Sequence, residues 1–331
     1  MCHFDGVTGD KARERIDADY IVIGSGAAGL RAALDLAPAG RVLILTKTEI
    51  RESNSRYAQG GIAAAIGESD SAELHFSDTL AAGAGLCDEE AVRILAEEGP
   101  GEIERLIEWG TGFDRKNGSI ELATEGAHSR ARVLHAQGDA TGKEIVRALS
   151  ARVRNFPSVT VIPFAFVQEL ILESNRVCGV RYSSQGKLFE AVARATLIAS
   201  GGAGQVYRET TNPPVATGDG FALGYRAGAL LCDMEFVQFH PTALKLPNLP
   251  PFLISEAIRG EGATLLAEAG AGIAVEIGDS ASYIAAVRDL AENQGRRVEM
   301  GAAGRRYAET SFSPQAVRDA YLALFERVRR K

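Results

Sequence analysis

The chain has 331 residues, 46% of them hydrophobic, and a formal net charge of −7. This length suffices for a large core and one or two domains, and the acidic balance argues against a nucleic-acid partner. The four cysteines are scattered without a C-x-x-C pair, which argues against structural zinc or a disulfide framework. Residues 1–18 are polar without a signal-peptide core, and no apolar run is of membrane-spanning length. We therefore expect a flexible N-terminus at 1–18 on a soluble, cytoplasmic protein with no membrane partner and no metal.

A glycine-rich fingerprint follows the first predicted strand. Residues 20–23 form a short apolar run typical of a buried parallel strand, and Gly24–Gly29 fits G-x-G-x-x-G. In this motif the first glycine permits a tight turn, the second lets the backbone approach a pyrophosphate, and the third lets the helix pack on the strand. A predicted helix over 30–37, whose N-terminus offers N–H groups to phosphates, and a second strand over 41–45 complete the unit. The pattern favours dinucleotide binding over a structural glycine turn.

The second strand does not end as it does in many dinucleotide folds, where an acidic residue holds a ribose hydroxyl. It is followed by Lys47, which cannot accept that hydrogen bond but can meet a phosphate or a ring carbonyl. The fingerprint therefore leaves open which dinucleotide binds. The next segment, Asn54–Gly61, combines two glycines with amide and hydroxyl side chains. It suits either a loop along a flat polar ring or an ordinary loop-to-strand junction.

The rest of the chain alternates helical and strand-like patterns. Residues 71–110 and 139–156 are expected to be helical, the latter with Asp139 as a candidate cap. Strands are expected over five ranges: 159–162, 165–172, 177–182, 187–192 and 195–200. The last strand runs into a second glycine-rich turn, which indicates a return of the chain to the same cofactor. The loop between the helices carries five charged or titratable side chains, interpreted by default as solvated: Glu125, His128, Arg130, Arg132 and His135.

Two polar segments follow the last strand. Asp219 precedes a predicted helix over 221–227 and is suited either to hold a cofactor hydroxyl or to cap the helix. His240 stands before a proline and close to a threonine. A lone histidine is more often structural than catalytic, so His240 alone does not establish a site.

Together these segments carry a resemblance to the flavoprotein family of succinate dehydrogenase and fumarate reductase, and within it to the L-aspartate oxidase branch. The resemblance covers about residues 17–267 and rests on eight motifs in the family's order: Gly24–Gly29, Lys47, Asn54–Gly61, Thr124–His128, 199–204, Thr217–Gly220, 238–242 and 255–262. It implies an α/β fold, with a Rossmann-like FAD-binding domain over 19–245. This domain starts with a βαβ unit. The start of an incomplete capping domain is expected over 246–267.

The resemblance also implies which residues bind the cofactor and the substrate. Asn54 stands where membrane-bound members carry the histidine that bonds to the flavin, so non-covalent FAD is expected. The implied FAD-binding residues are Gly24, Ser25, Gly26, Ala27, Ala28, Gly29, Lys47, Asn54, Ser55, Arg56, Tyr57, Ala58, Gln59, Gly60, Gly61, Phe166, Val167, Gly201, Gly202 and Asp219. The implied dicarboxylate-binding residues are Glu125, His240, Thr242, Ser255 and Glu256. Glu125 and His240 are the expected catalytic pair, facing one cavity near the flavin.

The activity implied by the resemblance is FAD-dependent oxidation of L-aspartate to iminoaspartate, with oxygen or fumarate as acceptor. This is the first step of quinolinate and NAD biosynthesis, with quinolinate synthase as a possible downstream partner. Two alternatives are an FAD-binding remnant without turnover and a soluble fumarate reductase-like flavoprotein. The family's later arginine and histidine motifs do not follow in this sequence, so weak activity is expected of the chain as given.

The tail, residues 268–331, resembles the C-terminal end of a group 1 glycosyltransferase instead. The expected elements are a strand within 271–279, a helix over 283–292, a basic segment over 296–306 and a closing helix over 314–329. The tail lacks the acidic nucleotide-sugar motif of that family, so a short α/β tail without transferase chemistry is expected.

Overall fold

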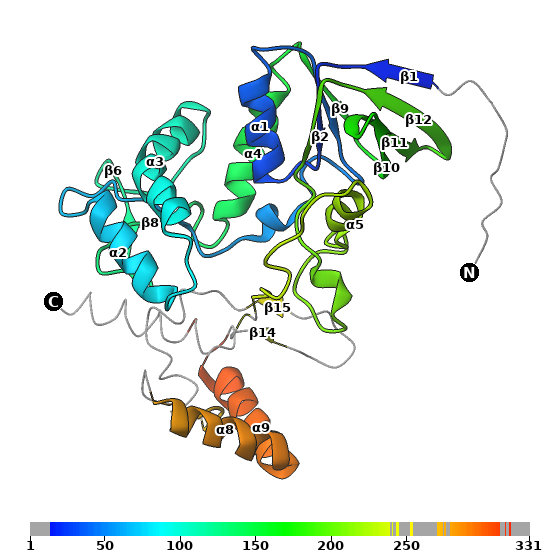
Figure 1. The fold of residues 1–331 in the computed structure, drawn as a ribbon. Helices are drawn as coiled ribbons and strands as arrows, with labels where there is room; N and C mark the ends of the chain where they lie inside the picture. Colours follow the sequence, from blue (N-terminus) through cyan, green and yellow to red (C-terminus); the bar gives the residue numbers. More distant parts are fainter. Residues whose placement is uncertain are drawn as a thin grey trace. The chain divides into compact units, whose positions relative to one another are not determined.

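The computed structural model describes residues 14–238, 240, 243–244, 252–253, 270–273, 275, 279–311, 315 and 318. The chain divides into two compact units, Met1–Glu256 and Ala257–Lys331, and each is considered by itself (Figure 1). The helices of the first unit are α1 (Ala27–Leu36), α2 (Ala72–Ala82), α3 (Glu89–Glu108), α4 (Thr141–Val153) and α5 (Asp219–Arg226). It also contains two short 3₁₀ turns, η1 (Asn54–Tyr57) and η2 (Gly204–Val206).

A parallel four-stranded sheet lies at the centre of the first unit, in the order β13–β2–β3–β9. Its strands are β2 (Tyr20–Ile23), β3 (Val42–Leu45), β9 (Val159–Ile162) and β13 (Ala195–Ile198). Side chains alternate between the two faces of a strand, so an uninterrupted apolar run supplies two cores. Val22 and Ile44 pack in the core on the helical side, whereas Ile21 and Leu43 pack in the core on the opposite face. The predicted βαβ start is therefore confirmed.

Helices α1 and α4 cover one face of this sheet (Figure 1). Leu30 and Leu34 of α1 share a core with Leu149 and Val153 of α4, and the spacing of four in each pair places both on one helical face. The predicted cap of α4 is wrong by one position. The helix begins after Ala140, without a side-chain cap.

The other face of the sheet packs against an antiparallel meander, β10 (Ala165–Glu173), β11 (Arg176–Ser184) and β12 (Lys187–Val192). The fully buried Val180 and Tyr182 belong to this layer. The meander gains a fourth strand, β1 (Glu14–Asp17), parallel to β12. Regular structure therefore begins inside the segment expected to be flexible, because backbone pairing with an exposed strand edge does not require an apolar sequence.

Residues 71–135 contain more separate helices and strands than expected. Helix α2 ends at its C-cap Gly83, after which Ala84 and Gly85 have φ of +50° and +85°, the left-handed conformation that ends a helix, and Asp88 then caps α3 by accepting from Ala91 N–H at 3.1 Å. The expected loop contains short strands, of which β8 pairs with both β4 and β7. The strands of the loop are β5 (Arg115–Lys116), β6 (Ser119–Ile120), β7 (Leu122–Ala123) and β8 (Val133–Leu134), whereas β4 (Ile62–Ala63) comes before this segment.

Two further short strands, β14 (Ala243–Leu244) and β15 (Phe252–Leu253), pair antiparallel near the end of the first unit. The second unit contains α8 (Ser280–Glu292), which agrees with the expected helix, and α9 (Gln294–Ser311), which takes up the basic segment. The described residues of 271–279 include no strand, and most of the expected closing helix lies outside the described residues. The domain boundaries and the glycosyltransferase-like origin of the tail stay predictions.

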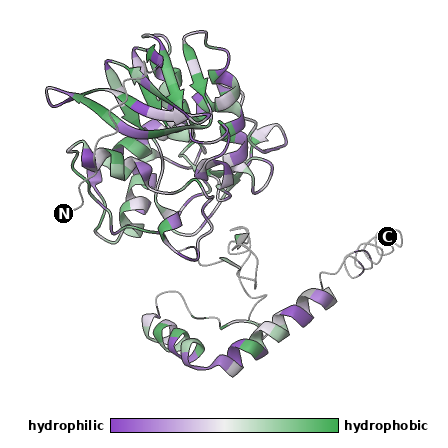
Figure 2. Cartoon of the chain, turned by 90° about the vertical axis from the view of Figure 1, so that its right-hand side faces the viewer, coloured by the Kyte–Doolittle hydropathy of each residue, from purple (hydrophilic) through white to green (hydrophobic). Residues whose placement is uncertain are grey.

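Hydrophobic and hydrophilic residues are interspersed along α8 and α9 (Figure 2). Within the described part of the chain, no helix is both long enough and apolar enough to cross a bilayer.

Candidate cofactor site

The three fingerprint glycines play different roles in the fold. A Cβ on Gly24, which has a φ of +110°, would lie 2.2 Å from the carbonyl oxygen of Ala199, and one on Gly29 would lie 2.1 Å from that of Gly24. Neither position can carry a side chain without moving backbone. A Cβ on Gly26 would meet only the Ser55 hydroxyl at 3.3 Å and Ser53 Cβ at 3.8 Å. The absence of a side chain at Gly26 therefore leaves space for a ligand at the N-terminus of α1.

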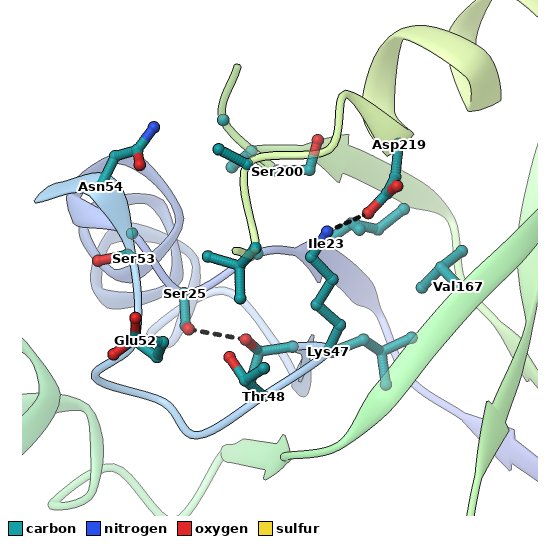
Figure 3. A pocket seen from close by; sticks show the side chains of 18 of the residues that line it. Ile23, Ser25, Lys47, Thr48, Glu52, Ser53, Asn54, Val167, Ser200 and Asp219 are labelled. Carbon is teal, nitrogen blue, oxygen red and sulfur yellow. Dashed lines mark hydrogen bonds and ion pairs between the residues drawn. The ribbon is translucent and has the colours of Figure 1, made fainter. Parts of the chain in front are cut away.

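An open cavity of about 230 Å³ occupies that space (Figure 3). It lies beyond the carboxyl ends of β2, β3 and β13, where open α/β sheets bind ligands. Of the predicted FAD-binding residues, the cavity is lined by Gly24, Ser25, Gly26, Ala27, Ala28, Lys47, Asn54, Ser55, Phe166, Val167, Gly201, Gly202 and Asp219. The chain thus returns to the fingerprint from four later segments, within 45–55, 165–167, 199–202 and 215–223.

Polar side chains in the cavity are held by one another. Lys47 Nζ lies 2.5 Å from Asp219 Oδ2 and donates to Thr217 Oγ1. Asp219 is the first residue of α5, after Gly218, so it is not the helix cap. Ser25 Oγ donates to Thr46 Oγ1 at 2.9 Å (Figure 3). These contacts fix a cation, a carboxylate and hydroxyls around one space.

Two further hydroxyls on the cavity wall, Thr48 Oγ1 and Ser53 Oγ, are buried and have no hydrogen-bond partner within the described part of the chain. A buried polar atom left without a partner costs about 1–3 kcal/mol, so such atoms are rare in native structures. A ligand with phosphate and hydroxyl groups would satisfy them. The hydrogen-bonding groups of the cavity therefore fit a dinucleotide cofactor.

The loop Asn54–Gly61 borders this cavity and is held in place from three directions. Ser55 Oγ accepts from Ala27 N–H at 3.1 Å, Asn54 Nδ2 donates to Asn212 Oδ1 at 2.9 Å, and Gly142 N–H donates to Ala58 O at 3.0 Å. A Cβ on Gly142 would lie 1.9 Å from Ser55 O. Only glycine at the start of α4 allows this close approach.

A second cavity, of about 750 Å³, is also lined by this loop. It shares Asn54 and Gly202 with the first cavity, and His240 is on its wall. It is also lined by four predicted FAD-binding residues: Tyr57, Ala58, Gln59 and Gly60. Gln59 Oε1 is a third buried polar atom without a partner among the described residues. His240 thus lines the same cavity as the loop predicted to follow the flavin ring.

The remaining predicted residues lie elsewhere or are not described. Arg56 forms an ion pair with Glu52 at 3.9 Å, and Gly61 packs against Leu134. Glu125 is not on the wall of either cavity; its carboxylate lies 3.4 Å from His135 Nε2. Three predicted substrate residues lie outside the described residues: Thr242, Ser255 and Glu256. A shared cavity for Glu125 and His240 therefore stays a prediction.

Several cavity residues were not predicted from the sequence: Thr46, Thr48, Glu52, Ser53 and Ser200. Glu52 accepts a hydrogen bond from Tyr57 OH at 2.9 Å, and this bond raises the pKa of Tyr57. A carboxylate seven residues after the second strand has no motif of its own. Only its position just before the polar loop could have indicated that Glu52 lies at the cavity.

The interpretation of Arg132 as a solvated charge is wrong. Its side chain is fully buried, with Asp70 Oδ1 at 2.8 Å and Asp78 Oδ2 at 2.6 Å. Asp78 also accepts from the backbone N–H and the hydroxyl of Ser129, both at 2.8 Å. The Ser129 backbone N–H, followed by its hydroxyl and Arg132, lowers the pKa of Asp78 from 3.8 to about 2.

This lowered pKa makes a prediction for acid stability. Because the pKa of Asp78 is lower in the folded than in the unfolded chain, its ionised form stabilises the fold above about pH 4, and this contribution is lost as the pH falls through about 2. We expect the unfolding free energy of the apoprotein to fall less steeply between about pH 5 and pH 2 in an Asp78→Asn variant than in the original protein. Urea unfolding followed by circular dichroism at each pH measures this; equal slopes would contradict it.

Comparison with known proteins agrees with this site. A family model described as FAD binding domain matches residues 19–314. The L-aspartate oxidase of Synechocystis sp. is 49% identical over 254 residues, which cover 76% of this chain and 46% of that protein. The chloroplastic L-aspartate oxidase of Arabidopsis thaliana is 48% identical over 263 residues, covering 75% of this chain and 40% of that protein. The chain thus spans less than half the length of these curated relatives.

Solved structures give the same result for the fold. Sdh1 of Mycobacterium smegmatis superposes with a TM-score of 0.70 at 34% identity, over 75% of this chain and 44% of that one. A variant of the E. coli quinol fumarate reductase FrdA superposes with a TM-score of 0.70 at 31% identity, over 80% of this chain and 47% of that one. The chain therefore belongs to the FAD binding domain family, as a flavoprotein of the succinate dehydrogenase and fumarate reductase type whose cofactor is FAD.

Proposed function

We propose that the protein carries out FAD-dependent oxidation of L-aspartate to iminoaspartate, with oxygen or fumarate as the electron acceptor. The observation that carries the proposal is the 49% identity to a protein named L-aspartate oxidase over 254 residues. The family match over residues 19–314 includes the walls of both cavities. The proposed activity therefore belongs to a site whose cofactor-binding residues lie within the described part of the chain.

Bound FAD supplies the acceptor for the hydride that leaves the substrate. The protein's own residues bind and orient the dicarboxylate. Glu125 offers a carboxylate that accepts hydrogen bonds from the substrate ammonium, and His240 offers an imidazole N–H to a substrate carboxylate. Thr242, Ser255 and Glu256 are proposed to complete this surface.

We further propose a cytoplasmic location and a role at the start of NAD biosynthesis. Iminoaspartate would then be consumed by quinolinate synthase. A relative from Arabidopsis thaliana is named chloroplastic, so location differs within the family and needs its own measurement. Fractionation of cells that express the tagged protein would provide it.

The activity is tested by supplying the purified FAD-bound protein with L-aspartate under air, and with L-aspartate plus fumarate without oxygen. Peroxide in the first case and succinate in the second are expected, with D-aspartate as the matched control. Reduction of fumarate by a reduced dye, without any oxidation of L-aspartate, would favour a fumarate reductase-like function. Bound FAD without turnover in either assay would favour a cofactor-binding protein.

We expect the FAD to be held without a covalent bond. Asn54 occupies the position of the flavin-linking histidine, and its amide instead donates to Asn212 Oδ1 at 2.9 Å. An amide is not a nucleophile that could form such a bond. Acid precipitation of the yellow protein should leave all flavin in the supernatant, and flavin that stays with the denatured pellet would refute the expectation.

A further inference from the structure

The loop between β7 and β8 carries Glu125 and is anchored to the protein at its far end. Ser129 donates from its backbone and from its hydroxyl to Asp78 of α2, both at 2.8 Å. The backbone N–H of Arg132 donates to the carbonyl oxygen of Ala123 at 3.1 Å, and this bond closes the base of the loop. The backbone around Glu125 is thus fixed by neighbours that take no part in the cofactor cavity.

The carboxylate of Glu125 is restrained by a different residue, His135. Nε2 of His135 lies 3.4 Å from Oε1 of Glu125, and the two side chains are 24% and 28% exposed. Both side chains are largely covered by protein, so water competes less for this contact than for one on the open surface. The contact therefore limits the rotation of the carboxylate.

His135 is itself held against the predicted flavin loop. It directly follows β8, in which Leu134 pairs with Ile62 of β4. Gly61, directly before β4, therefore lies across from His135. A Cβ on Gly61 would be 3.1 Å from His135 Nε2, so this nitrogen contacts the flavin loop and Glu125 together.

We propose that His135 is a positioning residue for substrate selectivity. It holds Oε1 of Glu125 and leaves Oε2 in a fixed orientation to accept hydrogen bonds from the ammonium group of an amino dicarboxylate. A dicarboxylate without an ammonium group gains nothing from this arrangement. The inference rests on the proposed function and adds to it the residue that orients the selecting carboxylate.

Two variants separate this role from general packing. His135→Leu removes the nitrogen, whereas His135→Gln keeps an N–H donor at nearly the same distance from the backbone. Binding to the FAD-bound protein is measured from the change in flavin absorption on titration with L-aspartate and with succinate. We expect His135→Leu to weaken L-aspartate binding by about tenfold, the scale of one hydrogen bond to a charged group. Succinate binding should be unchanged, and His135→Gln should restore L-aspartate binding.

Equal weakening for both ligands, or no effect of His135→Leu on either, would overturn the proposal. A second readout, hydrogen–deuterium exchange of residues 124–128, does not need substrate. Faster exchange in the Leu variant but not in the Gln variant supports the positioning role. If the original protein binds neither ligand, the proposed function fails, and the exchange result alone decides the role of His135: unchanged exchange in the Leu variant overturns it.

Discussion

A Gly26→Val protein is expected to fold but to lose FAD. The position has an extended backbone with φ of −69° and ψ of −177°, which valine adopts freely, and a Cβ there meets only the side chains of Ser53 and Ser55. The methyl groups would instead fill the cavity at the N-terminus of α1. Overpacking costs about 1–3 kcal/mol, and the close approach of backbone to pyrophosphate is lost as well. We expect FAD affinity to fall by about 100-fold or more.

The matched control for this prediction is Gly29→Val, three residues along the same motif. A Cβ there would lie 2.1 Å from the carbonyl oxygen of Gly24, so the variant should fail to fold rather than only fail to bind. Flavin fluorescence titration of each apoprotein measures binding, and circular dichroism measures folding. Retention of FAD by folded Gly26→Val would show that the pyrophosphate does not lie where the cavity places it.

The parallel sheet and the fingerprint could be predicted from the sequence because their determinants are local. Tyr20–Ile23 forms its strand as an apolar run, and the glycine spacing specifies the turn, so no distant residue needs to be known. Lys47 and Asp219 were each predicted at the cofactor, but not their contact at 2.5 Å. That contact joins residues 172 positions apart, and no periodicity encodes it.

The parts that could not be predicted depend on tertiary context. Gly142 looks like any glycine near a helix start, yet its lack of a side chain lets α4 contact Ser55 O. Asn212 likewise has no motif, and its role at Asn54 follows from the return of the chain to the cavity. Solvation is the default interpretation of an arginine in a charged loop, and it fails for Arg132 because two carboxylates of another segment surround the guanidinium.

The buried position of Arg132 leads to the largest expected loss of stability. Its guanidinium contacts Asp70 through two nitrogens, each at 2.8 Å, and Asp78 through a third at 2.6 Å. Asp70 is 1% exposed and Asp78 17%, so water cannot replace a lost partner of Asp70. Arg132→Met keeps an unbranched apolar stem but removes the guanidinium, which leaves the buried carboxylate of Asp70 without its cation and Asp78 with only its Ser129 hydrogen bonds. Removing one partner of a buried pair destabilises a protein by about 3–5 kcal/mol.

The control is Arg105→Met on the surface of α3, where the ion pair with Glu102 at 3.0 Å joins side chains that are 45% and 40% exposed. Exposed pairs contribute about 0–1 kcal/mol, so this variant should unfold close to the original protein. Urea unfolding of the FAD-bound proteins gives both values. Adding Asp70→Asn to Arg132→Met should recover part of the loss, because the second change removes an unpaired buried charge. A loss below about 1 kcal/mol for Arg132→Met, or no recovery in the double variant, would mean that the network is open to solvent and does not hold the loop that carries Glu125.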